Sequence, residues 1–292
     1  AYAEHHDTPM RGLAEVLQEK GLAQARIALE TRYLPAHSYL ELGRELPNAS
    51  FFDAAEVLNQ TRMIKSQDEI DLMRRIALAA EKAIEYGFLF SRPGDTELEV
   101  VERMQRALHD LGGEWNPFVT LAAGAENTTK KHYSASAKPI RPGDIIHVDM
   151  VGFWQGYYTD FARMGVVQNP EDGQREAYRR VIDVQRHVME VARPGVHACD
   201  LYESCAEYSR QIGMPFNMNI IGHSLGIGLH EYPILGPAYE QKLEANMMLC
   251  IEVGSEVPGL GRYHVEDLIL ISEDRNILLT DHMDTSEMTV VR

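Results

Sequence analysis

Four acidic residues fall into two pairs, and each pair flanks its own turn sequence. Asp149 and Asp160 flank Gly-Phe-Trp-Gln-Gly. Glu252 and Glu266 flank Pro-Gly-Leu-Gly. If each stretch is a β-hairpin folded at its midpoint, the two acids of a pair lie directly opposite each other, with Cβ atoms about 5 Å apart. Carboxylates that close repel unless one is protonated or a cation lies between them. The spacing therefore predicts a pocket for divalent metal.

Histidines near these acids could add nitrogen ligands. His223 lies in the glycine-rich run Gly-His-Ser-Leu-Gly, and His230 follows it closely. A histidine in such a run is more often a turn residue, but the four acids favour a ligand. A site with mostly carboxylates and one imidazole suits Mn²⁺, Co²⁺, Fe²⁺ or Zn²⁺. Two such ions about 3.5–4 Å apart can activate a hydroxide and polarise a carbonyl. His132 is a third candidate, with a surface histidine as the alternative.

Each acid also has a purely structural interpretation. Asp149 and Asp160 could be solvated hairpin residues, with Arg163 offsetting their charge. Glu252 could stand where an apolar strand meets solvent, and Glu266 stands at the head of another apolar run. An acid on a mostly buried strand is costly unless it is paired or bound to metal. We therefore favour the metal site.

A faint internal repeat predicts how the acids come together. Ser66 and Thr96 each begin a capping box ahead of a helical pattern. The sequence Arg-Pro-Gly at 92–94 recurs at 193–195, and the run 145–149 resembles 248–252. Each half thus contributes two helices and then a hairpin with two acids. Duplicated halves place their hairpins side by side about a pseudo-two-fold axis, so the site receives acids from both.

Composition limits the class of protein. The chain has 292 residues, 45% of them hydrophobic, and a net charge of −16. This charge argues against nucleic acid or an anionic membrane as the partner. No apolar run reaches the roughly 20 residues of a membrane span, and no signal peptide is visible. Three cysteines without ligand spacing favour a reducing compartment. We expect a cytoplasmic enzyme.

Residues 1–60 contain pieces of an α/β unit. Two helical patterns alternate with two strand-like runs, too few to close a sheet. We expect residues 1–60 to be the end of a larger N-terminal domain, followed by a catalytic domain over 61–292.

The four acids and His223 resemble a known ligand set: Asp149, Asp160, His223, Glu252 and Glu266. In order and spacing they are similar to the metal ligands of the pita-bread metallopeptidases, which include methionine aminopeptidase, prolidase, aminopeptidase P and creatinase. The likeness covers about residues 60–290. Three further runs resemble the prolidase and aminopeptidase P branch: Arg-Met-Ile-Lys-Ser (62–66), Gly-His-Ser-Leu-Gly (222–226) and Leu-His-Glu-Tyr-Pro (229–233). The fold implied is α+β with duplicated halves, helices outside a curved antiparallel sheet and metals inside. Residues 1–60 would be the remnant of a creatinase-type N-terminal domain.

The resemblance also implies roles for the residues. Asp149 and Asp160 would chelate one ion, and Asp160 and Glu266 would bridge to the second. His223 and Glu252 would complete the other shell, with Mn²⁺ as the expected metal and Co²⁺, Zn²⁺ or Fe²⁺ as alternatives. Glu252 would also carry protons.

Histidines would act on the substrate. By the resemblance, His132 and His230 would bind the substrate and stabilise the tetrahedral oxyanion. Three departures lie near the ligands: His264 in place of arginine, Ser224 in place of glycine and Val253 in place of proline. We place His264 with the substrate-binding residues. These departures affect specificity for proline more than metal binding.

Three functions follow. The leading one is an Xaa-Pro peptidase, of prolidase or aminopeptidase P type, that cleaves the bond before proline through a metal-bridging hydroxide. A second keeps the fold and metals but acts on a small non-peptide amide, amidine or osmolyte. A third is a catalytically dead binding module, against which the intact ligand set argues. The expected partners are a peptide or small-molecule substrate and a second copy in a homodimer.

Overall fold

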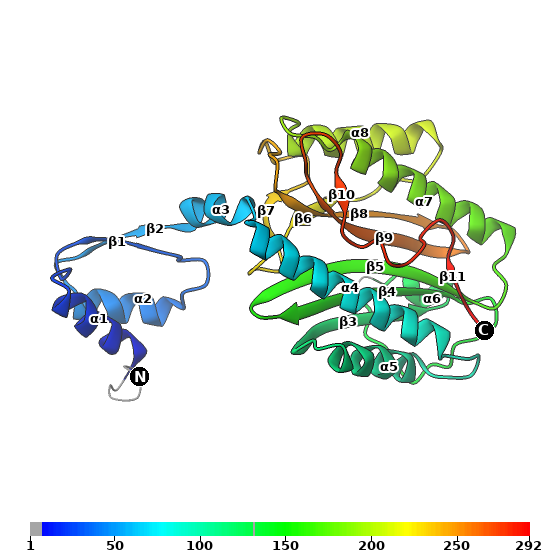
Figure 1. Cartoon of the computed structure of the whole chain (residues 1–292), viewed down its shortest axis with the longest axis horizontal. Coiled ribbons are helices and arrows are strands. Elements are labelled where there is room, and N and C mark those ends of the chain that lie inside the picture. Colours follow the sequence, from blue (N-terminus) through cyan, green and yellow to red (C-terminus); the bar gives the residue numbers. More distant parts are fainter. Residues whose placement is uncertain (1–7, 131) are drawn as a thin grey trace. The chain divides into compact units, whose positions relative to one another are not determined.

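The computed structural model describes residues 8–130 and 132–292, which divide into two compact units with the boundary between Thr61 and Arg62 (Figure 1). In the first unit α1 (Pro9–Glu19) and α2 (Ala36–Glu45) alternate with β1 (Arg26–Leu29) and β2 (Ser50–Asp53). The two strands pair in parallel. Ala14, Leu42 and Leu46 form the buried core of this unit. The predicted α/β pieces are therefore present.

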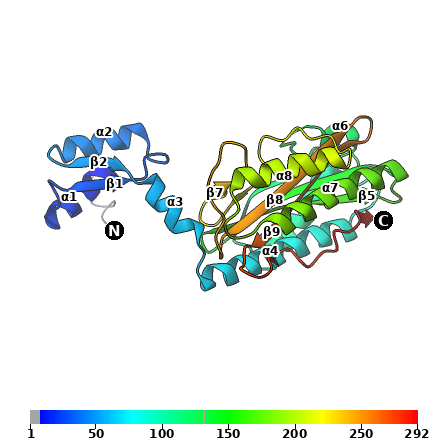
Figure 2. The ribbon, with the colours of Figure 1, turned by 90° about the horizontal axis from the view of Figure 1, so that it is seen from above.

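Helix α3 (Ala55–Met63) leads from the first unit into the second. The described residues of the second unit then form five helices: α4 (Gln67–Leu89), α5 (Glu97–Asp110), α6 (Ala125–Thr128), α7 (Asp172–Val191) and α8 (Ala198–Gln211). Both predicted capping boxes form, with Ser66 accepting from the Glu69 backbone and Thr96 from that of Glu99. Figure 2 shows α4, α7 and α8 running alongside the strands. Within 8–130 and 132–292, no helix is long and apolar enough to cross a membrane.

Two sheets carry the rest of this unit. One has the order β11-β5-β4-β3 and the other β10-β9-β8-β6-β7. The strands of the first are β3 (Trp115–Ala123), β4 (Ile145–Trp154), β5 (Tyr157–Val167) and β11 (Thr289–Val291). Those of the second are β6 (Gly222–Ser224), β7 (Glu231–Ile234), β8 (Met248–Val257), β9 (Gly261–Leu270) and β10 (Ile277–Leu278). Each neighbouring pair is antiparallel except β5 and β11.

The predicted duplication is visible in the backbone. Gly94 and Gly195 both have positive φ, 99° and 90°, after the first helix of each half. Gly112 and Gly213, with φ of 97° and 70°, follow the second helix. Each half then continues into a long hairpin, β4–β5 or β8–β9. These two pairs of glycine turns lie at corresponding positions, 101 residues apart, so both halves have the same order of helices and turns.

One predicted hairpin register is correct and the other is wrong. Glu252 lies directly opposite Glu266, as expected. Asp149, however, lies opposite Ala162, and Asp160 lies opposite Val151. The reason is the turn: Gln155 and Gly156, both with positive φ, close a tight two-residue loop that is not centred between the acids. The two aspartates are therefore diagonal neighbours on one face, still within reach of a shared ligand.

Alternation along the strands separates a helix side from an acid side. On β4, Ile146, Val148 and Met150 pack in one core with residues of α4 and α5. On β8, Leu249, Ile251 and Val253 pack in another core with residues of α7 and α8. The intervening positions hold Asp149 and Glu252, so both acids emerge on the faces turned away from these cores.

A buried arginine joins the central strands of the two halves on the helix side. Arg163, on β5, is 2% exposed. Its guanidinium lies 2.7 Å from Glu81 on α4 and 2.8 Å from Asp267 on β9. It also donates to the main-chain oxygen of Glu266 at 2.7 Å and to that of Thr280 at 3.2 Å. Its charge is therefore matched by the chain's own carboxylates.

Replacing Arg163 with methionine should cost about 3–5 kcal/mol of unfolding free energy, because it leaves Glu81 and Asp267 buried without a counter-charge. Urea denaturation measures the change. The matched control is Arg179→Met, which removes an arginine from the exposed pair with Glu287 and should behave like the wild type. Equal stability of Arg163→Met and the control would contradict this account.

Candidate metal centre

The four predicted carboxylates and His223 lie together on the acid side of the two hairpins. Ligand atoms of Asp149, Asp160 and Glu266 fall within 4.8 Å of one another. The ligand atoms of His223, Cys250 and Glu252 also lie within 4.8 Å of one another and form a second group. Asp160 also lies within 4.8 Å of His223 and His230. The two halves thus supply one continuous cluster.

His223 is held with one nitrogen directed at the carboxylates. It lies on β6, beside Cys250 of β8, and is 1% exposed. Its Nδ1 donates to the carbonyl of Ser224 at 2.9 Å, which leaves the Nε2 lone pair for a ligand bond. Nε2 lies 3.1 Å from Glu252 Oε1 and 3.7 Å from Asp160 Oδ2.

A glycine next to His223 allows the close approach of β6 to β8. A Cβ on Gly222 would lie 2.1 Å from the carbonyl oxygen of Cys250, and the φ of Gly222 is 148°. Any other residue would push β6 away. Gly222 therefore fixes the distance between His223 and the acids of β8 and β9.

Burial and mutual repulsion disturb the acids. Burial, followed by the charge of Glu252, raises the pKa of Asp149 to about 7. Burial and then the charge of Asp149 raise the pKa values of Asp160 and Glu266 well above their ordinary range. Burial alone would lower the pKa of His223, but the hydrogen bond with Glu252 and the nearby negative charges outweigh it and raise that pKa. Such a cluster is electrostatically incomplete without a cation.

His230 and His132 stand at the exposed edge of the cluster. The His230 ring makes a T-shaped contact with His223, with centroids 4.2 Å apart. Burial, and then the charge of His223, lowers the pKa of His230, and the charge of His132 lowers it further. His132 itself is exposed, has a φ of 51° and contacts the ring of Phe118. Of the two, only His230 is grouped with the ligand atoms.

A buried ion pair supports the turn that leads to His230. Lys65 Nζ lies 2.9 Å from Glu231 Oε2, and both side chains are buried. The other oxygen of Glu231 accepts the backbone N–H of Gly228 at 2.8 Å. Lys65, from the start of the second unit, therefore fixes the chain next to His230.

His264 occupies an inner position that the sequence did not explain. It is 8% exposed, and its Nε2 lies 3.5 Å from Glu266 Oε1. Its Nδ1 is hydrogen-bonded to Nε2 of His147 at 3.2 Å. Burial, and then the charge of Arg262, lowers the pKa of His147 to about 3. A neutral His147 therefore backs His264, whose other nitrogen reaches a carboxylate of the cluster.

Two residues of the cluster were not predicted. The thiol of Cys250 is buried and donates to the main-chain oxygen of Asp160 at 3.4 Å and to Glu266 Oε2 at 3.7 Å. Burial, and then the charge of Glu266, raises its pKa well above the ordinary value, so the thiol is neutral. Cys250 precedes Glu252 by two residues, as His147 precedes Asp149. The period of a β-strand could have placed both on the acid face.

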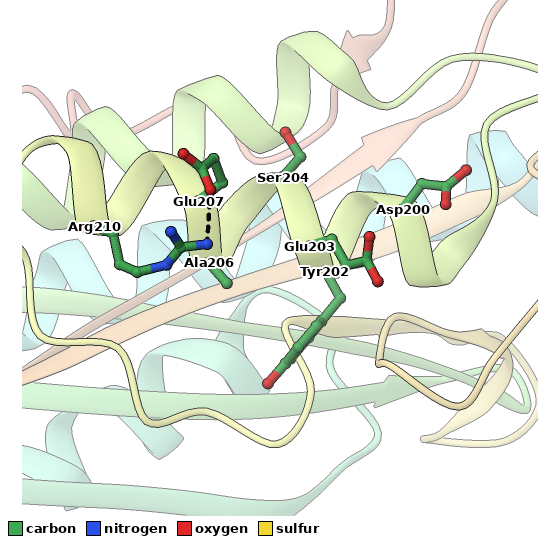
Figure 3. A pocket seen from close by; sticks show the side chains of 7 residues that line it. All are labelled: Asp200, Tyr202, Glu203, Ser204, Ala206, Glu207 and Arg210. Atoms are coloured by element: carbon green, nitrogen blue, oxygen red, sulfur yellow. Dashed lines mark ion pairs between the residues drawn. The ribbon is translucent and has the colours of Figure 1, made fainter.

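A hollow on α8 lies on the opposite, helical side of the sheet. Figure 3 shows it lined by exposed helix side chains, among them Asp200, Glu203 and Glu207 with Arg210. None of the carboxylates described above lines it. The chemistry-bearing residues are therefore elsewhere, on the acid side of β4, β5, β8 and β9.

Residues 71–273 match metallopeptidase family M24, and residues 2–64 match the creatinase/prolidase N-terminal domain. Among curated proteins, the chain is 30% identical to an Xaa-Pro dipeptidase of Pyrococcus furiosus over 82% of this chain and 69% of that protein. It is 31% identical to an Xaa-Pro dipeptidase of Pyrococcus horikoshii, covering 85% of this chain and 71% of the relative.

Solved structures agree on the fold. The X-Pro aminopeptidase of Thermotoga maritima superposes with a TM-score of 0.89 at 23% identity, covering 97% of this chain and 78% of that one. The prolidase of Pyrococcus furiosus superposes with a TM-score of 0.83 at 26% identity, covering 93% and 80%. The resemblance seen in the sequence is thus confirmed. The chain belongs to metallopeptidase family M24 and has the pita-bread fold of its prolidase and aminopeptidase P members.

Proposed function

We propose that this chain is an Xaa-Pro peptidase that holds two divalent metal ions between its two hairpins. The observation that carries the proposal is the buried cluster of four carboxylates and His223. Among the described residues, the ion pairs of these carboxylates are with histidines and not with lysine or arginine. The Xaa-Pro dipeptidases among the relatives support proline as the residue after the cut.

The residues present fit metal ions. Asp149 Oδ1 is buried and has no hydrogen-bond partner within the described chain, a costly state for a carboxylate oxygen. A cation there removes that cost. The donors are mainly carboxylate oxygens with one imidazole, a set that suits Mn²⁺ first among the candidates. Asp149, Asp160 and Glu266 would hold one side of the centre, and His223 and Glu252 the other.

Bound metal supplies a Lewis acid and an activated water at neutral pH. Glu252 is the carboxylate best placed to move protons, since its side chain is 16% exposed against 9% for Asp160 and 6% for Glu266. Glu252 would take a proton from the attacking water and give it to the leaving amine. His230 and His132, at the exposed edge, would bind the substrate and donate to the developing oxyanion.

A second candidate function keeps the site but changes the substrate. The hydrogen-bonded His147–His264 pair stands where, by the resemblance, the prolidase branch has arginine, so the groups beside Glu266 differ from those expected of that branch. This difference favours a small non-peptide amide as the alternative substrate. The homodimer stays a prediction, which light scattering would check.

A peptide panel tests the proposed function. Protein stripped of metal and reloaded with Mn²⁺, Co²⁺ or Zn²⁺ should cleave Ala-Pro but leave Ala-Ala intact, as read by mass spectrometry. Metal-dependent turnover restricted to the bond before proline supports the proposal. Two bound metals with no peptide turnover would overturn it in favour of the non-peptide substrate.

Replacing Asp160 with alanine should abolish both metal occupancy and turnover, because it removes the carboxylate shared by two ligand groups. Metal content after dialysis and activity on Ala-Pro measure the two losses separately. The control is Asp183→Ala on the exposed face of α7, which should retain both. Wild-type metal content in Asp160→Ala would refute the ligand assignment.

The raised acids of the metal-free protein should lower its stability as pH rises from about 4, the ordinary carboxyl pKa, to about 7, the pKa of Asp149 in the folded chain. Asp149, Asp160 and Glu266 have raised pKa values, so the folded state keeps protons that the unfolded state has already released, and unfolding becomes easier with pH. His147 and His230, whose pKa values are lowered, act in the opposite sense only below about pH 6.5.

Thermal unfolding with chelator and with Mn²⁺ across this range checks that prediction. The melting temperature should fall with pH only in chelator, because bound cation favours the ionised acids. Parallel curves with and without metal would contradict it.

A further inference from the structure

Arg262 lies on the acid side of β9 and points along the row of site residues. Strand alternation places it on the same face as His264 and Glu266. On this face three successive cross-strand pairs, every second pair of the ladder, run from the candidate metal centre toward the hairpin turn: Glu252 with Glu266, Gly254 with His264, and Glu256 with Arg262. Arg262 is therefore the outermost member of the row that begins at the proposed ligands.

The guanidinium of Arg262 has no bonded counter-charge in the described part of the chain. Its backbone N–H donates to Thr128 Oγ1 at 3.1 Å, but its side chain forms no hydrogen bond or ion pair there. The residue is half-buried, and burial lowers its pKa against the opposing charges of Glu266 and Glu252. Every buried arginine charge costs free energy unless an anion meets it. Arg163, by contrast, has two such partners.

The side chain leans toward the metal centre instead of toward its cross-strand neighbour. Nη2 lies 3.3 Å from the point where a Cβ on Gly254 would stand. Gly254 separates Glu252 from Glu256 on the same face of β8. This close approach places the guanidinium over the bare backbone at Gly254.

If the bond is cut beside Glu252 and the substrate runs along β8 toward the hairpin turn, Arg262 lies one residue beyond that bond. Two residues along a strand span about 6.6 Å, which separates Gly254 from Glu252. In an extended peptide each residue spans about 3.3–3.6 Å, and a charged hydrogen bond adds about 2.8 Å. A carboxylate one residue past the scissile carbonyl therefore reaches Arg262. In a longer peptide a neutral amide would take that place, and the charge would stay unpaired.

We propose that Arg262 binds the C-terminal carboxylate of a dipeptide and thereby makes this enzyme a dipeptidase. The proposal rests on the proposed function in taking a peptide as substrate. The planar guanidinium matches a carboxylate through two parallel hydrogen bonds, which a lysine cannot reproduce. Substrate length is then read by charge, and no wall at the end of the cleft is required.

Kinetics on three substrates test this role: Ala-Pro, Ala-Pro-amide and Ala-Pro-Ala. Wild-type kcat/KM should be about 100-fold higher for Ala-Pro than for the other two, the value of one charge-assisted pair. Arg262→Met should lower kcat/KM about 100-fold on Ala-Pro, chiefly through KM, and change it less than about threefold on the amide. Arg262→Lys should fall between. The control is Arg180→Met on the exposed side of α7, which should match the wild type.

An equal loss on Ala-Pro and on its amide in Arg262→Met, at wild-type metal content, would overturn the proposal, as would wild-type protein that cleaves all three substrates alike. Calorimetric titration with L-proline and L-prolinamide separates this proposal from the proposed function. If no Xaa-Pro peptide is cleaved but proline binds more tightly than prolinamide only when Arg262 is present, the carboxylate site stands and the peptidase assignment fails. If Ala-Pro is cleaved and the preference for proline over prolinamide survives Arg262→Met, the peptidase assignment stands and the carboxylate site at Arg262 fails.

Discussion

The guanidinium of Arg163 fixes the two strands on which the metal centre depends. It lies on the helix side of β5 and β9, between Glu81 and Asp267, and donates to the main-chain oxygen of Glu266. Asp160 and Glu266 project from the same two strands on the opposite face. On one face the chain balances its buried carboxylates with a bonded arginine, whereas on the other it brings acids together with no arginine bonded to them in the described residues. This asymmetry between two faces of one layer favours a cation from outside.

Duplication explains how such an unfavourable cluster can be assembled. Each half forms its helices and hairpin through local signals, such as the capping boxes at Ser66 and Thr96 in the first half and at Glu171 in the second. The two pairs of acids meet only when the halves pack. The free energy of that packing, from apolar burial on the helix side, outweighs repulsion on the acid side. The two pairs nevertheless differ, since Glu252 faces Glu266 directly while Asp149 and Asp160 are diagonal.

The sequence predicted the acids, the helices and the duplication because each leaves a local or periodic trace. The offset of Asp149 from Asp160 was missed because it depends on positive φ at Gln155, a residue with no strong preference for that conformation. Cys250 and His147 carry a strand-period signal but no motif. The placement of Arg262 over Gly254 could not be predicted, because its side-chain direction depends on the absence of a Cβ on the neighbouring strand.

The position of positive charge along β9 bears on both the proposed metal ions and the proposed substrate. An arginine two residues before Glu266 would lie beside the ligands and neutralise them permanently. Here that place holds His264, hydrogen-bonded to His147, and the arginine stands two residues farther out at position 262. Under the proposals above, bound metal would offset the repulsion within the cluster, and the guanidinium would meet an anion of the substrate. A cation two residues farther out on the same face would then recognise substrate, whereas one beside the ligands would steady them.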